Sequence, residues 1–458
     1  MKLYRFLYKL YIFLIPFGTL FNIRGEGIGF WYYFSASNLV MMVGVMLLLL
    51  NNSLSLFDKT ISKWVRMVIF MIFYTTLCAV IVDFVWGDLN GESSYSVIPH
   101  SVFFLGIFLL TILYNYTSFK RYIKFKELFP IFKVQSAILL FVGLVQYFTL
   151  QGFGPAAVLN EALSMVLCVR DSEYLFSVGH GITLFGTEPS SVASICLWLL
   201  PFKFLYAYYS KKKLYFFEVL IWSFLLCNSG STSNLISYVT MMGCLFFVIK
   251  GKTIPRFVYA SAFLLGICIA LTYAHADLGR LNANRLGEHD LKYILYGKVF
   301  DVSGNGSTVV RASSVANGIK VFEEFPLTGI GDGLLGYRFI QSAPDWVKYS
   351  VFTEDLLSGE YGIIEGGGGF FCSYLSGFGV IGLFVLLGFL AAYKKDMHRM
   401  KNDYLINNMF GIAVVIFLYS AWYTMGLNGI VAFVLCLPYA ARQKSSENFI
   451  AYYFKKDN

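Results

Sequence analysis

The chain has 458 residues, of which 57% are hydrophobic and 14% charged, and its mean hydropathy is +0.64. Soluble domains carry charge on about a quarter of their residues, so this composition excludes an ordinary soluble enzyme and predicts a polytopic membrane protein. The net charge of +9 does not indicate nucleic-acid binding, because the lysines and arginines separate apolar runs instead of forming one basic patch.

Apolar runs along the chain predict an all-α protein with twelve membrane spans, each of about 20 residues or somewhat fewer. The basic start, Met1 to Lys9, is similar to that of a signal peptide, but no small-residue cleavage site follows, so we expect a retained first helix. In chain order the predicted spans are Leu7–Phe21, Ala36–Leu50, Val65–Val85, Val102–Tyr114, Phe132–Leu150, Ser191–Tyr208, Tyr215–Cys227, Asn234–Ile249, Phe257–Tyr273, Phe370–Tyr393, Phe410–Met425 and Asn428–Ala441.

Basic residues divide the loops into two alternating sets, and 26 of the 36 lysines and arginines lie in one set. Short loops rich in Lys and Arg stay in the cytoplasm, so we expect both termini to be cytoplasmic. The predicted organisation is nine helices in residues 1–273, with an outer loop at 151–189. A large outer loop follows at 274–369, and three helices and a cytoplasmic tail occupy residues 370–458.

The large outer loop contains a predicted helix that carries an arginine. Val315, Ile319 and Phe322 fall at i, i+4 and i+7, which predicts an apolar face, and Arg311 extends that face. The acidic residues at 323 and 324 are more than three turns from Arg311. An unmatched arginine on a packing face costs several kcal/mol, and its planar guanidinium suits phosphate oxygens. Arg311 is therefore the main candidate for binding an anion.

A second candidate group lies where the sixth span begins. Glu188-Pro189 has a structural interpretation, since Pro suits the first helical turn and a carboxylate there complements the helix dipole. It also has a functional one, because ionisable groups at a membrane boundary usually face a cavity, a partner or a substrate. His180 is either an ordinary solvated loop residue or a residue that takes part in the reaction. Arg170 is the only lysine or arginine in residues 151–189, and Arg338 is a further candidate that could equally be an exposed loop charge.

Several classes of site are not indicated. The sequence has no Walker motif and no HExxH, and seven of the eight cysteines lie in or beside apolar runs, so we predict neither a metal site nor a cofactor. Charges within the predicted spans keep to the span ends. An ion-coupled transporter normally holds charges near the bilayer midplane, which counts against transport.

Three motifs, taken in order, resemble the bacterial O-antigen polymerase and ligase superfamily. The first is Phe185-Gly186-Thr187-Glu188-Pro189-Ser190, and the second is Asn228-Ser229-Gly230-Ser231-Thr232-Ser233-Asn234-Leu235. The third is Arg311 followed by Phe325-Pro326-Leu327-Thr328-Gly329-Ile330-Gly331-Asp332-Gly333 and later by Gly379-Val380-Ile381-Gly382. The number of spans, their orientation and the large outer loop before the tenth span are also similar to that family.

The resemblance implies an all-helical, GT-C-like glycosyltransferase of the bacterial inner membrane that takes glycan from an undecaprenyl-pyrophosphate carrier on the periplasmic side. Arg311 would neutralise the pyrophosphate, and Glu188, or His180, would serve as the base. Ser231, Thr232 and Asp332 lie in the matching motifs and would contact substrate together with Arg170 and Arg338. Implied partners are the lipid-linked oligosaccharide, membrane lipid, a chain-length regulator and a flippase.

Two departures from the family pattern bear on the activity. Thr232 stands where many members have an arginine, so a second phosphate contact would come from elsewhere, for instance Arg170. Ligases carry a His-Asn pair before the tenth span, whereas this chain has Gly366 to Gly369, which favours a polymerase over a ligase. A lipid-linked oligosaccharide flippase is the remaining alternative. It needs a charged lumen and no large outer domain, so the sequence favours it less.

Overall fold

The computed structural model describes parts of every region of the chain. The described residues are 2–17, 36–54, 58–87, 98–124, 127–167, 169–176, 181–185, 192, 195, 199–200, 203, 213–229, 318–331, 369–399, 432–433 and 436. Within them every regular element is a helix and no strand occurs. The all-α prediction is therefore confirmed for this part of the chain.

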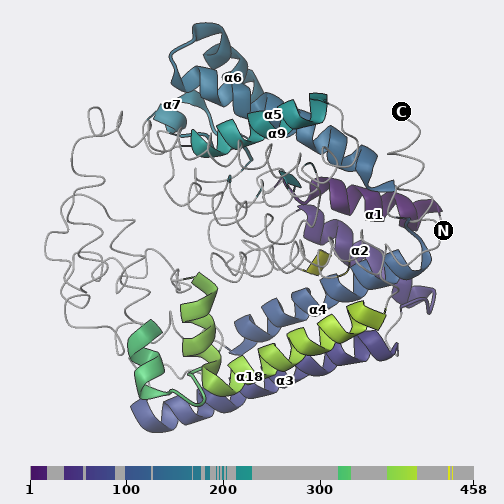
Figure 1. Ribbon diagram of the computed structural model, residues 1–458, viewed down its shortest axis with the longest axis vertical. Helices are drawn as coiled ribbons and strands as arrows, with labels where there is room; N and C mark the ends of the chain where they lie inside the picture. Colours follow the sequence, from purple (N-terminus) through teal and green to yellow (C-terminus); the bar gives the residue numbers. More distant parts are fainter. Residues whose placement is uncertain are drawn as a thin grey trace, which may run out of the picture.

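Besides a helical stretch at 318–324, nine helices have assigned bounds among the described residues (Figure 1). They are α1 (Lys2–Leu14), α2 (Ala36–Leu50), α3 (Lys59–Trp86), α4 (Ile98–Arg121), α5 (Phe129–Leu150), α6 (Gly154–Leu167), α7 (Ser172–Tyr174), α9 (Lys213–Cys227) and α18 (Gly369–Arg399). Three helical stretches are long and apolar enough to cross a membrane, namely Ile61–Val85, Phe129–Leu150 and Leu375–Tyr393. The protein is therefore a membrane protein by the length and composition of its helices.

The described helices fall on seven of the predicted spans, and α2 has the predicted bounds. Several others extend beyond the apolar run into basic residues, as α4 does by including Lys120 and Arg121 in its last turn. Cations there complement the partial negative charge at a helix C-terminus. Of the predicted span Ser191–Tyr208, the five described positions are helical and buried. The spans predicted at 234–249, 257–273 and 410–425 lie outside the described residues.

The helices form two groups with α1 and α2 between them. In Figure 1, α4 and α18 lie alongside α3, while α6, α7 and α9 surround α5. α1 contacts both α2 and α5, and α2 contacts α4. The main core lies among α1, α4 and α5, where Tyr8 donates a 2.8 Å hydrogen bond to Oδ1 of the equally buried Asn115.

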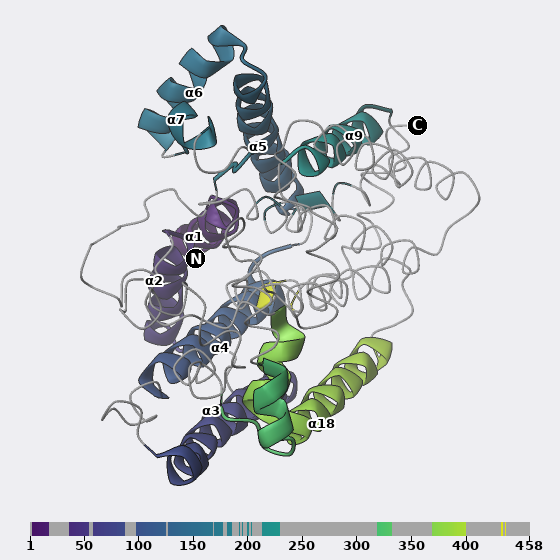
Figure 2. The ribbon, with the colours of Figure 1, turned by 90° about the vertical axis from the view of Figure 1, so that its left-hand side faces the viewer.

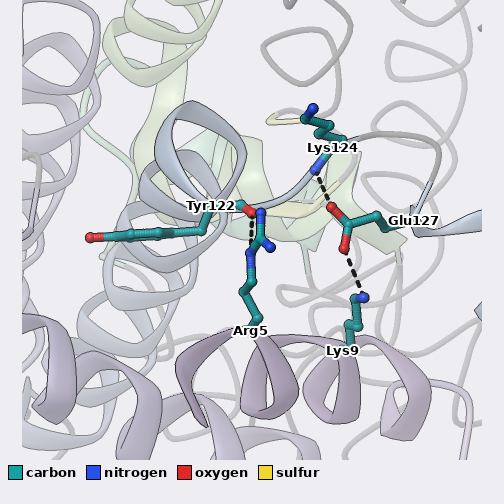
Figure 3. A network of polar contacts seen from close by, with 5 residues as sticks. All are labelled: Arg5, Lys9, Tyr122, Lys124 and Glu127. Carbon is teal, nitrogen blue, oxygen red and sulfur yellow. Dashed lines mark hydrogen bonds and ion pairs between the residues drawn. The ribbon is translucent and has the colours of Figure 1, made fainter. Parts of the chain in front are cut away.

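Polar contacts hold the first helix to the turn between α4 and α5 (Figure 3). Arg5 donates from Nε to the carbonyl oxygen of Tyr122 at 2.9 Å, and Lys9 Nζ lies 2.7 Å from a carboxylate oxygen of Glu127. The other oxygen of Glu127 accepts from the backbone N–H of Lys124 at 3.1 Å. Partial burial alone would raise the pKa of Glu127, but these hydrogen bonds and the Lys9 charge hold it below its usual value.

Candidate functional site

The described residues include the approaches to both predicted catalytic groups. Residues 181–185 precede Glu188, and residues 318–331 follow Arg311. Residues 181–185 and 325–331 are non-helical stretches that pack against the described helices. Backbone of this kind is tolerated at membrane depth only where protein or water satisfies its hydrogen bonds. The partners of these two stretches therefore define how the candidate site is held.

A buried amide on α5 holds the approach to Glu188. The side-chain oxygen of Gln146 accepts hydrogen bonds from the backbone N–H groups of Thr183, at 3.1 Å, and Leu184, at 2.8 Å. Its side-chain nitrogen donates two longer bonds of 3.4 Å, to the hydroxyl of Thr183 and the carbonyl of Leu184. All three residues are fully buried. The Gln146 amide thus replaces the water that this stretch of backbone would otherwise need.

The same approach contains a strained residue. Leu184 has φ of +53°, a left-handed conformation that costs a non-glycine residue roughly 1–3 kcal/mol and persists only where the surroundings impose it. Gly143, one turn before Gln146, makes room for this residue, since a Cβ there would lie 2.9 Å from Leu184 Cδ2. The ring of Phe185 is also buried, and it packs edge-on against Phe17 with the ring centroids 4.8 Å apart. The chain direction is therefore fixed three residues before Glu188.

The second approach interlocks with a break in α18. Gly379 has φ of 58° and ψ of −161°, so α18 consists of two parts that meet at this residue, as Figure 1 shows. Residues 326–331 pair with the break through four backbone hydrogen bonds. Ile330 and Gly331 donate to the carbonyls of 376 and 377 at 2.8 and 2.7 Å, and residues 380 and 381 donate to those of 326 and 327 at 2.9 and 3.1 Å. The two parts of the third motif, almost 50 residues apart, form one unit.

Two glycines and one tyrosine make this interlock possible. A Cβ on Gly329 would lie 2.5 Å from the backbone carbon of residue 377, and a Cβ on Gly379 would overlap the carbonyl oxygen of Leu327. Both glycines also have positive φ. From α3, the Tyr74 hydroxyl lies 2.7 Å from the carbonyl oxygen of Thr328 and 3.2 Å from that of Phe378. Tyr74 therefore bridges both sides of the interlock.

The apolar face predicted for the helix that follows Arg311 is wrong at Ile319, whereas Phe322, the other described residue of that face, is partly buried. The described part of this helix covers residues 318–324, and Ile319 is 51% exposed instead of buried. The buried side chains are those of Val321 and Phe325, which pack with Ile330 against Ala79 and Val82 of α3. The interlock sets this rotation, because it anchors the chain just after the helix. Spacing of apolar residues alone could not reveal it.

Arg170 is the one predicted site residue that lies among the described residues. Its guanidinium carbon lies 4.3 Å from the ring centroid of Tyr174, which is cation–π geometry, and its buried Nε has no hydrogen-bond partner among the described residues. Its carbonyl accepts from the Asn160 side chain at 3.0 Å, which ties the turn to α6. Within the described part of the chain, Arg170 thus keeps one donor unused. The predicted residues His180, Glu188, Ser231, Thr232, Arg311, Asp332 and Arg338 lie outside the described residues.

A charged pair is buried among the described helices. Lys203 Nζ lies 2.7 Å from a carboxylate oxygen of Glu218 on α9, and only 7% of the Lys203 side chain is exposed. The same carboxylate oxygen accepts a hydrogen bond from Ser136, whose oxygen accepts from Trp222 Nε1 at 2.8 Å. Lys203 and Glu218 both belong to predicted spans, within which the sequence places charges at the span ends. Their pairing was not predicted.

Gln146 and Tyr74 are the two positioning residues that the sequence analysis missed. Gln146 could have been noticed, because it is a polar amide within the apolar run 132–150. Tyr74 offers no such signal among 32 tyrosines. No group of three or more His, Cys, Asp or Glu side chains that could hold a metal occurs among the residues the structure describes. The sequence matches no protein-family model and no curated protein.

Proposed function

We propose that this protein is an O-antigen-type polysaccharide polymerase. It joins undecaprenyl-pyrophosphate-linked repeat units by glycosyl transfer at the periplasmic face of the bacterial inner membrane. In this proposal twelve helices cross the membrane, both termini are cytoplasmic and residues 274–369 form the large periplasmic loop.

The observation that carries the proposal is the pairing of the two parts of the third motif. Residues 326–331 and 376–381 are bonded to each other through their backbones, and Tyr74 of α3 contacts both. The motif resembles the superfamily in sequence, and the pairing gives its glycines a physical reason. It also anchors the chain that follows Arg311 to two long apolar helices, α3 and α18, which supports a site at the membrane surface.

The chemistry requires charge neutralisation and a base. The leaving group is a lipid pyrophosphate, whose developing charge is stabilised by guanidinium donors in a site poor in water. Arg311 supplies this contact. Arg170, whose Nε has no partner among the described residues, supplies the second phosphate contact that Thr232 does not. The nucleophile is a sugar hydroxyl of the acceptor repeat unit, and Glu188 or His180 removes its proton. The hydrogen bonds from the backbone of Thr183 and Leu184 to Gln146 fix the chain five and four residues before Glu188.

Arg311 variants test the proposal most directly. Arg311→Lys keeps the charge but loses the planar two-point pairing with phosphate, so activity should fall strongly, and Arg311→Ala should abolish long chains. The measurement is the chain-length distribution of the glycan on a gel, alongside the amount of folded protein in the membrane. Arg280→Ala, in the same outer loop, is the control and should change chain length little.

Two outcomes would contradict the proposal. Full-length polymer from Arg311→Ala at a normal protein level would remove Arg311 from the reaction. Deletion of a polymerase leaves a single repeat unit on the lipopolysaccharide, whereas deletion of a ligase or a flippase leaves none. Complete absence of repeat units would therefore replace the polymerase by one of these alternatives.

A further inference from the structure

Helix α6 has its polar residues covered and its apolar residues exposed, the reverse of a helix in water. Its three polar side chains, Asn160, Glu161 and Ser164, are buried or partly buried. Every exposed residue is glycine, proline or apolar, and Val158, Met165 and Val166 are 73%, 83% and 74% exposed. A helix on a water-facing surface carries charged and polar residues on its exposed side. The surroundings of this face are therefore apolar.

The polar side of α6 is occupied by the turn that carries Arg170. Asn160 donates to the Arg170 carbonyl at 3.0 Å, and a Glu161 carboxylate oxygen accepts from the backbone N–H of Ser172 at 2.8 Å. The polar residues of α6 thus bind protein, while Leu163 and Leu167 pack against the main core. The face containing Val158, Met165 and Val166 points away from both.

This exposed face continues the exposed face of α5. Val134, Phe141 and Phe148 are spaced seven residues apart on α5, each with about half of its surface exposed, and α5 is long and apolar enough to span a membrane. From Phe148 the apolar surface passes to Phe153, whose ring centroid lies 6.4 Å away, and then to α6. Figure 2 shows α6 running back at an angle from the end of α5. The two helices therefore present one continuous apolar surface.

We propose that α6 is embedded in the membrane leaflet at the C-terminal end of α5, with Val158, Met165 and Val166 in contact with lipid acyl chains. Amphipathic helices of this kind place their apolar face about 5–10 Å into the boundary between head groups and acyl chains. Since the 170–174 turn is bonded to the polar side of α6, lipid contact also fixes Arg170 near the level of the head groups. This inference is independent of the proposed enzymatic activity.

Photo-crosslinking in native membranes tests the lipid contact. The photoreactive residue p-benzoylphenylalanine replaces Met165 in one full-length variant and Val166 in another, two exposed positions where a larger side chain displaces nothing. Irradiation should give a mass increase equal to one phospholipid in both. Phe141 of α5 is the positive control and should give the same adduct. Exposed Glu173, on the turn at the polar side of α6, is the matched control and should give several-fold less.

Each other outcome would overturn the inference. A crosslinked dimer from Met165 or Val166 would show that a second copy covers this face, and an adduct with another protein would show a protein partner. Absence of any adduct at both positions, with a lipid adduct at Phe141, would show that the face lies in water.

Discussion

A single amide on α5 fixes the backbone five and four residues before Glu188. Gln146→Leu preserves the apolar bulk but leaves two buried N–H groups without an acceptor, at a cost of roughly 1–3 kcal/mol each. We expect a lower melting temperature of the purified protein and shorter glycan chains. Gln146→Glu retains an oxygen that can accept from Thr183 and Leu184, so it should recover much of the chain length.

Gln135 provides a matched control for this prediction. It is also buried on α5, three turns or about 16 Å before Gln146, and its side chain donates to the carbonyls of Ile12 and Phe13 at 2.7 and 2.9 Å. Gln135→Leu should lower the melting temperature by a comparable amount without shortening the glycan. If both variants shorten it equally at equal protein level, Gln146 acts through stability alone and does not position Glu188.

The buried pair of Lys203 and Glu218 should behave as one unit. Removing one partner leaves an uncompensated charge in a medium of low dielectric constant, and such changes cost about 3–5 kcal/mol. Lys203→Met should therefore destabilise the protein strongly, while the double variant Lys203→Met with Glu218→Leu should recover most of the loss. Thermal unfolding of the four proteins of this cycle in detergent measures the coupling. Additive losses would show that the 2.7 Å contact carries no net interaction.

At the scale of elements, the interlock between residues 326–331 and the break in α18 depends on its glycines. Gly379→Ala introduces both an unfavourable backbone conformation, which costs roughly 1–3 kcal/mol, and an overlap with the Leu327 carbonyl. We expect it to release the segment, measured as increased protease cleavage near residue 331 and loss of long glycan chains.

Gly388, on the same helix, gives the matched control for Gly379. It has nothing within 4 Å of its Cβ position and lies within the regular part of α18. Gly388→Ala should leave cleavage and glycan unchanged and stabilise the helix by about 0.5–1 kcal/mol. Equal cleavage of the two variants would mean that the break at Gly379 does not hold the segment.

Sequence patterns predicted the helices better than their irregularities. Long apolar runs placed α2, α3, α5 and α18, because burial in lipid needs little more than length and apolar composition. The break in α18 was not predicted, since it arises from its pairing with a segment almost 50 residues away. α6 was missed because residues 151–189 were interpreted as a polar outer loop, although 14 of them form a largely apolar helix.

In the candidate site too, sequence patterns predicted some features and missed others. The motifs identified the glycines at 329 and 379, whose roles follow from their contacts. Arg170 was predicted as a charged contact, but its position above the Tyr174 ring could be known only from the fold. Gln146 was not identified at all, because one amide in an apolar run gives no indication of which backbone it will bind.

At the scale of the whole molecule, residues from three predicted cytoplasmic segments meet at one end of the described helices. Lys9 of α1 pairs with Glu127, and Arg5 donates to the carbonyl of Tyr122, both in the stretch between α4 and α5 (Figure 3). Lys120, at the end of α4, pairs with Asp58 in the stretch between α2 and α3. Loops that lie on one side of a membrane can make such contacts, whereas loops on opposite sides cannot.

Reporter fusions along the chain test the orientation that follows. Alkaline phosphatase requires disulfide bonds, which form outside the cytoplasm and not within it, so its activity reports the side on which a fusion point lies. Fusions after Gly304 should be active, and fusions after Lys394 should be inactive, because the basic residues at 394–401 predict a cytoplasmic loop. A cytoplasmic fluorescent reporter at the same two points should give the opposite result. Fusions at Gly304 and Lys394 that report the same side would remove the tenth span and place Arg311 and α18 in a different topology. That result would also contradict the proposed site at the outer surface of the membrane.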